Sequence, residues 1–352
     1  MGASASAPLG GSLDYASSDE LVQCAAGLKP EQREKLLKAL QAATVTAAVL
    51  AKQDSETSQA ILTAYAGDAG FQSISDRLTK EIMARDKEDG EKLGNGIQKA
   101  VDKGVLPAKV DVEPTTKVLV SGKTADAVSD EIISALGDAP SKGCILVLQG
   151  LSGTGKGTTV AKLKEKLPKA QTWSNGNIFR SITLLAVTWS EKEGKSLDDA
   201  LAPAMLKDFC SMLDFNKFKD NGPFDVKIEG LGLKYFVSEV EKTVLKDSKV
   251  AKNIPKVAEV TQGECVLFVS DALSKMSAAG INVLVEGREQ TLNHIRTPHR
   301  FELVLNDNTI IGKRQAALQI GGKAWEAVGK SAIASESAVA DAIQKAIADL
   351  NK

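Results

Sequence analysis

The chain has 352 residues, of which 43% are hydrophobic and 25% are charged, values typical of a globular protein long enough for two domains. The net charge of −1 and the 4% of aromatic residues argue against a strongly basic nucleic-acid surface or a base-stacking platform. The four cysteines and two histidines lack metal-ligand spacing, so we expect reduced thiols and no metal site built from side chains.

Residues 1–18 are rich in Ala, Ser and Gly, and we expect a flexible tail there. The tail begins MGASAS, which matches the pattern for myristoylation of Gly2; the alternative is an unmodified tail of small residues. One acyl chain would give only weak, reversible membrane contact. Because no apolar run reaches the roughly 18 residues of a membrane span, we expect a cytoplasmic protein with at most transient membrane association.

The next segment, residues 19–138, has the pattern of a mainly helical domain. Ser17 or Ser18 together with Glu20 is typical of a helix N-terminus, and Pro30 is typical of a first helical position. Apolar residues then recur at helical spacing. No evident catalytic group lies in this segment. Its role is not indicated, and we interpret it as an interaction or oligomerisation module that binds a protein partner.

The pattern changes around residues 105–143. Two prolines and short β-branched runs in 105–122 indicate a linker with one or two strands, followed by an amphipathic helix that ends at Gly137. After the turn-rich stretch 139–143, strands and helices alternate. This order predicts an α/β domain over 139–352, with a parallel sheet of the P-loop NTPase type flanked by helices. The expected strands are CILVLQ, INVLVEG and FELVLND, and AQTWS is expected to be a strand or a turn.

A glycine-rich loop follows the first of these strands and precedes a helix. Its glycines let backbone N–H groups point at phosphate oxygens, and the helix N-terminus adds positive potential. Lys156 supplies a positive charge for the β- and γ-phosphates of a nucleotide, and it is a candidate catalytic residue. The residues predicted to bind the nucleotide are Gly150, Ser152, Gly153, Thr154, Gly155, Lys156, Gly157, Thr158 and Thr159.

The loop has glycine at 157 where the general phosphate-loop pattern has Ser or Thr. The form GLSGTGKGT resembles that of nucleoside monophosphate kinases, and the best match within that group is to the cytidylate kinases, over residues 144–315. The resemblance implies that Thr158 takes over the phosphate contact. It also implies ATP and Mg²⁺ as cofactors, with Mg²⁺ held by ATP and water more than by a loop hydroxyl.

Three further segments carry the resemblance: SNGNIFRSITLLAV, VEGREQT, and an inserted monophosphate-binding region at about 215–262 that includes SKVAKNIPKV. They imply that the substrate is a nucleoside monophosphate, CMP or dCMP. The residues that match the family's substrate contacts are Gly176, Arg180, Ser248, Arg288 and Glu289. Of these, Arg180 and Arg288 would hold the acceptor phosphate, Ser248 would contact the cytosine, and Glu289 would face the base.

The chain also departs from the family pattern. Ala258 stands where the family has a phosphate-binding arginine, and the arginine-rich lid is reduced to Lys313 and Arg314. Lys313 and Arg314 are the remaining candidates for stabilising the transferred phosphoryl group. Lys323 or Lys330 is a further residue that would compensate for the lost arginines. Three interpretations therefore stay open. They are a cytidylate-like kinase, a nucleotide-binding pseudokinase that regulates the helical N-terminal half, and a kinase of another small molecule.

Overall fold

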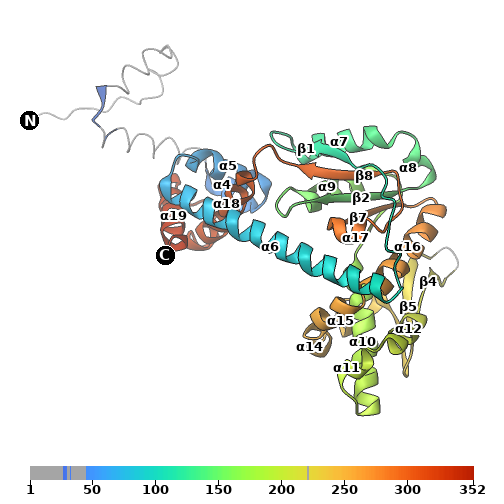
Figure 1. Ribbon diagram of the computed structural model, residues 1–352. Helices are drawn as coiled ribbons and strands as arrows, with labels where there is room; N and C mark the ends of the chain where they lie inside the picture. Colours follow the sequence, from blue (N-terminus) through green and yellow to red (C-terminus); the bar gives the residue numbers. More distant parts are fainter. Residues whose placement is uncertain (1–26, 30–31, 33–44, 220–221) are drawn as a thin grey trace, which may run out of the picture. The chain divides into compact units, whose positions relative to one another are not determined.

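The computed structural model describes residues 27–29, 32, 45–219 and 222–352 (Figure 1). The expectations for the tail, for Gly2 and for helices beginning near Ser17 and Pro30 lie outside the described residues. The chain divides into two compact units. One, the helical unit, comprises the described residues up to Leu78 together with Gly312–Lys352. The other, the sheet unit, comprises Thr79–Ile311.

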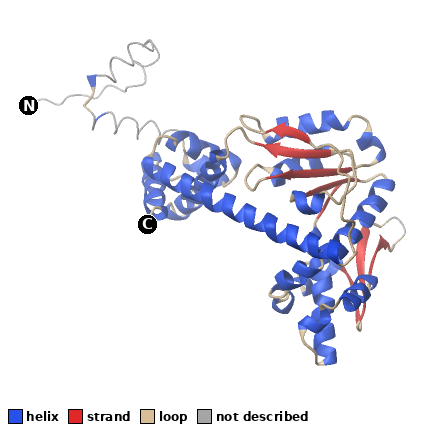
Figure 2. Ribbon diagram, viewed as in Figure 1, coloured by secondary structure: helices blue, strands red, loops and turns tan. Residues whose placement is uncertain are grey.

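A five-stranded parallel sheet forms the centre of the sheet unit (Figure 2). Its flanking helices confirm the α/β class expected from the alternating pattern. The four predicted strands are present, and a fifth joins them at one edge. In spatial order the strands are β1 (Thr116–Leu119), β8 (Arg300–Val304), β2 (Ile145–Gly150), β7 (Asn282–Gly287) and β3 (Ala170–Trp173).

Both faces of this sheet are covered by helices, which explains why its central strands are continuous apolar runs. Leu146 and Leu148 of β2 lie in the core formed with two helices of one face, and Ile145 and Val147 lie in the core formed with helices of the other. The first face is covered by α7 (Ala125–Leu136) and α9 (Lys156–Lys166), and the second by α10 (Asn175–Glu193) and α16 (Gln262–Ala278).

A small antiparallel sheet with short helices occupies the predicted insertion at about 215–262. Its strands are β4 (Leu213–Lys217), β5 (Phe224–Gly230) and β6 (Leu233–Phe236). Phe215 and Phe224 stack with ring centroids 5.2 Å apart, which anchors the first hairpin to the core. The helices of the insertion are α13 (Val237–Val240), the 3₁₀ turn η1 (Val244–Lys246), α14 (Ser248–Ala251) and α15 (Ile254–Val260), and two further helices, α11 (Leu197–Ala200) and α12 (Pro203–Ser211), precede it.

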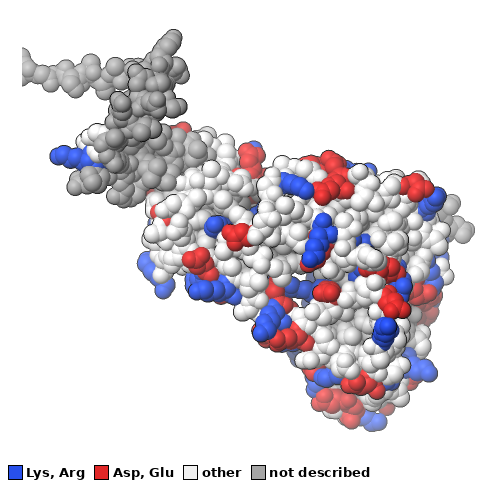
Figure 3. All heavy atoms as spheres, turned by 45° about the horizontal axis from the view of Figure 1, so that its top comes forward, with Lys and Arg blue, Asp and Glu red and all other residues white. Residues whose placement is uncertain are grey.

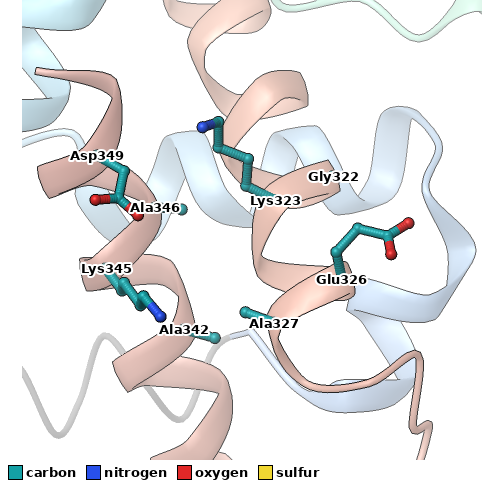
Figure 4. Close-up of a pocket in the computed structure, with 8 residues that line it drawn as sticks. All are labelled: Gly322, Lys323, Glu326, Ala327, Ala342, Lys345, Ala346 and Asp349. Carbon is teal, nitrogen blue, oxygen red and sulfur yellow. The ribbon is translucent and has the colours of Figure 1, made fainter. Parts of the chain in front are cut away.

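The helical unit packs helices from both ends of the chain around one core, which includes Leu50, Ile61, Phe71, Ile320 and Ile343. It contains α4 (Ala47–Lys52), α5 (Ser55–Tyr65), α19 (Glu336–Leu350), the start of α6 (Ala69–Asp102) and most of α18 (Thr309–Ala327). A surface hollow lies between α18 and α19 and is lined by small residues and four charged side chains (Figure 4).

The two compact units divide the chain at other positions than the predicted domain boundary at 138/139. Residues 79–138 belong to the sheet unit, because β1 pairs with β8 and α7 packs on α9. Residues from 312 onward belong to the helical unit, because α18 and α19 cover the apolar faces of α4 and α5. The helix over 124–138 is confirmed, and it ends at Gly137, which has a φ of 57°. In the described part of the chain, no helix has the length and apolar character needed to cross a membrane.

Candidate phosphate-binding site

The glycine loop, residues 150–159, connects β2 to α9. Gly150 has a φ of 146°, and a Cβ there would lie 2.8 Å from the carbonyl oxygen of Leu303 on β8. Gly153 has a φ of 81°, and a Cβ there would lie 2.8 Å from Ile311 Cγ2. Both positions therefore require glycine. The backbone curls closely over the end of the sheet and leads into the N-terminus of α9, where unpaired N–H groups favour an anion.

Lys156 is the first residue of α9, and its side chain turns back over the loop. The ammonium donates hydrogen bonds to the carbonyl oxygens of Gly150, at 2.8 Å, and Leu151, at 2.9 Å. Burial lowers the pKa of Lys156, the positive charge of Arg288 lowers it further, and Glu286 and Asp86 act in the opposite direction. These charged groups therefore lie close enough to Lys156 to affect its titration.

The parallel strands bring three sequence-predicted segments to one edge of the sheet. Gln149 of β2 pairs with Gly287 of β7, and Val285 of β7 pairs with Trp173 of β3. The glycine loop, Arg288 and the start of α10 consequently all follow the carboxyl ends of neighbouring strands. This is the edge at which open α/β sheets bind ligands.

Arg288 follows β7 and lies against the glycine loop. Its Nη2 atom is 3.3 Å from Ser152 Oγ. The same nitrogen is 2.7 Å from Asp86 Oδ1 and 3.3 Å from Asp89 Oδ2, so Arg288 is paired with two carboxylates of α6. Hydrogen bonding to Asp86 raises the pKa of Arg288. Arg288, for which we predicted a phosphate contact, thus lies next to the loop. Its positive charge is already balanced by the two carboxylates.

Asp86 is the site residue that the sequence did not reveal. Its Oδ2 atom accepts a hydrogen bond of 2.6 Å from the backbone N–H of Ser152, and its side chain is only 3% exposed. Burial raises the pKa of Asp86, but hydrogen bonds from Arg288 and Ser152 outweigh burial and hold it well below the usual value. Asp86 is therefore an anion at neutral pH. The only local signal is a pair of acids three residues apart in a long helix.

Arg180 lies near the start of α10, about one turn after Gly176. A Cβ at Gly176 would be 2.9 Å from Arg180 Nη1, so glycine leaves the space that the guanidinium occupies. Arg180 Nη1 donates to Asn177 Oδ1 at 3.2 Å, and Asn177 in turn donates to Glu241 Oε2 at 3.0 Å. Within the described ranges, no carboxylate forms an ion pair with Arg180, unlike Arg288.

The remaining four predicted residues lie on three other helices. Glu289 is exposed at the first position of α17 (Glu289–Leu292), and Ser248 is exposed at the first position of α14. Lys313 and Arg314 lie half-buried on α18 in the helical unit. The roles assigned to these four side chains stay predictions.

Two other arginines of the sheet unit have structural partners. Arg300 is 1% exposed and donates to the carbonyl oxygens of Leu292 and Ile295 and to Asn293 Oδ1. Arg296 pairs with Glu113 at 2.8 Å. On the face visible in Figure 3, acidic and basic side chains are interspersed, in keeping with the small net charge.

No protein-family model matches the chain, and no curated protein matches its sequence. In the parts of the chain that the structure describes, no group of three or more His, Cys, Asp and Glu side chains is arranged to hold a metal ion.

Proposed function

We propose that this protein is an ATP-dependent nucleoside monophosphate kinase with a P-loop NTPase-type sheet domain and CMP or dCMP as acceptor. The observation that carries the proposal is the position of Lys156 over a glycine loop, next to Arg288 and at the sheet edge where α10 begins. A loop of this shape is suited to a triphosphate, because backbone N–H groups, a helix N-terminus and an ammonium converge on one place.

In the proposed reaction, an oxygen of the acceptor phosphate forms a bond to the γ-phosphorus of ATP. The bond between that phosphorus and the β,γ-bridging oxygen breaks, and ADP leaves with the bond's electron pair. Lys156 would stabilise the negative charge on the β- and γ-phosphates, and Arg180 would hold the acceptor phosphate in line. Mg²⁺ would enter with ATP and neutralise part of its charge.

The choice of acceptor base rests on the family resemblance. Glu289, at the start of α17, carries a carboxylate that can accept a hydrogen bond from a cytosine amino group. Ser248 would provide a second polar contact to the base. Both are exposed, and we infer that they contact the acceptor only in the substrate complex.

A transfer assay tests the proposal. The full-length chain would be incubated with Mg-ATP and CMP, dCMP, UMP or AMP, and diphosphate products would be separated by chromatography. We expect CMP or dCMP to react fastest, with turnover well above that of a Lys156→Ala variant. Equal product with wild type and Lys156→Ala would contradict the proposal.

A second candidate function is a nucleotide-binding pseudokinase that regulates the helical N-terminal half of the chain. The observation that favours it is that the Ser152 amide and Arg288 already hold the carboxylate of Asp86. The shortage of lid arginines, with Arg314 as the single arginine after β8, points the same way. ATP binding by calorimetry without diphosphate product from any acceptor would favour this function over the kinase.

A further inference from the structure

The contact between α6 and the glycine loop places the carboxylate of Asp86 where a phosphate group would bind. Asp86 Oδ2 accepts from the Ser152 N–H at 2.6 Å, and Asp86 Oδ1 lies 2.7 Å from Arg288 Nη2. A backbone N–H of a glycine loop and an arginine guanidinium are the donors that a phosphate group uses. The two carboxylate oxygens of Asp86 thus have the partners of two phosphate oxygens.

The two anions cannot use these donors together. The N–H of Ser152 carries one hydrogen, and the Nη2 of Arg288 is already shared between Asp86, Asp89 and Ser152 Oγ. Like charges at hydrogen-bonding distance from the same donor also repel each other strongly in a partly buried site. A phosphate that takes the N–H of Ser152 and the Nη2 of Arg288 must therefore displace the Asp86 carboxylate.

The part of α6 that carries Asp86 is packed on the sheet unit by its C-terminal turns. A Cβ at Gly96 would lie 2.6 Å from Gln262 Cγ, so the helix approaches α16 closely. Ala100 is buried in a small apolar cluster with Val266, and Lys99 forms an ion pair with Glu259. Asp86 lies about three turns before Gly96, so it is positioned by an anchored helix.

The contacts that Asp86 and its neighbour Asp89 make with the loop and with Arg288 are between charged and polar groups. Asp89, one turn later, lies 3.3 Å from Arg288 and is 46% exposed. Gly90 would place a Cβ 3.1 Å from Gln290 Nε2 and Gly94 would place one 4.0 Å from Gln290 Cγ, so both glycines face a polar side chain. Release of residues 79–95 from the loop would therefore break these polar contacts, and Ile82, which is 8% exposed, is the buried apolar side chain of the segment that could also be affected.

We propose that Asp86 is an internal competitor of phosphate, which occupies the Ser152 amide and Arg288 until a nucleotide displaces it. This inference rests on the proposed function, because it takes the glycine loop as the nucleotide site. The measured nucleotide affinity then depends on how much more strongly these donors bind phosphate than they bind the Asp86 carboxylate. It also assigns residues 79–95 of α6 the role of a segment that regulates access to the site.

Calorimetry on the full-length chain tests the inference, with Mg-ATP and inorganic pyrophosphate as the two probes. The Asp86→Asn variant keeps the shape and the acceptor oxygen for Ser152 but loses the charge. We expect it to bind both probes about tenfold more tightly than wild type, within the range usual for coupled sites. The matched control is Glu88→Gln on the same helix, which pairs only with Lys92 at the surface and should leave affinity unchanged.

The outcomes separate the inference from the proposed function. Affinity of Asp86→Asn equal to or weaker than that of wild type overturns the inference, because Asp86 would then position Arg288 for the ligand. Tighter binding without phosphoryl transfer supports the inference and contradicts the kinase. No binding of either probe to any variant overturns both.

A second measurement uses the wild-type chain and does not depend on a variant that folds. Hydrogen exchange of the peptides covering residues 79–95 should become faster when Mg-ATP is saturating, because the displaced segment loses its contacts. Peptides covering residues 125–136 of α7 should not change. Exchange over 79–95 that stays constant or slows in the presence of Mg-ATP would overturn the inference.

Discussion

The ammonium nitrogen of Lys156 lies 2.8 Å from the carbonyl oxygen of Gly150, six residues earlier in the chain, and donates a hydrogen bond to it. A second bond of 2.9 Å reaches the carbonyl oxygen of Leu151. The side chain thus spans the loop. In a nucleotide complex, its three N–H groups could also reach phosphate oxygens.

Replacement of Lys156 by alanine should remove function and leave the fold intact. We expect kcat for CMP phosphorylation to fall about 10²–10³-fold, because a charge that stabilises the transferred group is lost. The thermal midpoint should shift by less than about 4 °C, because the lost hydrogen bonds are offset by relief of the cost of burying a charge. A larger drop in the midpoint would mean that Lys156 has a mainly structural role.

The lowered pKa of Lys156 predicts a pH dependence. Burial and the nearby Arg288 favour the neutral amine, so Lys156 loses its proton below the ordinary value of 10.5. The unfolded chain binds more protons than the folded chain in that window, so the contribution of Lys156 to stability rises with pH there. Phosphate affinity should do the opposite and fall, because the neutral amine no longer attracts an anion.

A Lys156→Arg variant provides the comparison for this pH dependence. Arginine stays charged throughout the alkaline range. We expect the Mg-ATP affinity of wild type, measured by calorimetry between pH 7 and roughly pH 10, to fall at the alkaline end more steeply than that of the variant. Parallel curves would mean that another group controls the alkaline loss.

Much of the sheet could be predicted because its signals are local. β2 and β7 are short apolar runs that end at Gly150 and Gly287, and both are buried on two faces. The glycine loop is continuous in sequence, so its strand, its helix and Lys156 could be located together. β1 was expected only as a strand in a linker. Its pairing with β8, with Thr116 opposite Phe301, depends on contacts that no local pattern carries.

The place of Asp86 in the site could not be predicted either, because it depends on contacts between residues far apart in the sequence. Asp86 is 66 residues from Ser152 and 202 from Arg288 along the chain. Its helix has the composition of a solvated charged helix, and only tertiary packing brings Asp86 and Asp89 of that helix to Arg288. The helical unit is similar, because Ile61 is packed against Gly321 near the other end of the chain.

Gly176 offers a substitution that should separate function from stability. It is the second residue of α10, and its φ lies outside the left-handed region, so alanine is compatible with the backbone. Alanine in a helix is favoured over glycine by about 0.5–1 kcal/mol. Its Cβ would meet only flexible ends, chiefly Arg180 Nη1 at 2.9 Å. Gly176→Ala should therefore raise the unfolding midpoint slightly while moving the Arg180 guanidinium.

The consequence for substrate should appear in the acceptor alone. We expect KM for CMP to rise about tenfold, the size of one displaced charge-assisted hydrogen bond, with KM for ATP unchanged in steady-state assays. Gly322→Ala on α18 is the matched control, because its Cβ would approach only Gln53 Oε1, at 3.8 Å. An unchanged KM for CMP in Gly176→Ala would argue against the role proposed for Arg180.

Asn282, at the first position of β7, should be one of the most sensitive positions for stability. Its side-chain oxygen accepts from the N–H of Cys144 at 3.1 Å, and its amide nitrogen donates to the carbonyl oxygens of Pro140 and Pro168 at 2.9 Å and 2.7 Å. The residue is 1% exposed. The amide therefore has three backbone partners at the start of the sheet, of which the N–H of Cys144 is buried and the two carbonyl oxygens are partly buried.

Asn282→Ala leaves the buried N–H of Cys144 without its side-chain acceptor and removes the donor to two partly buried carbonyl oxygens. We expect the free energy of unfolding to fall by about 2 kcal/mol, because an unsatisfied buried polar group costs about 1–3 kcal/mol. Urea unfolding monitored by circular dichroism measures the loss. Asn306→Ala, at an exposed position, is the control and should change stability by less than about 0.5 kcal/mol. Equal losses in the two variants would show that the buried amide does not join β7 to the ends of its neighbouring segments.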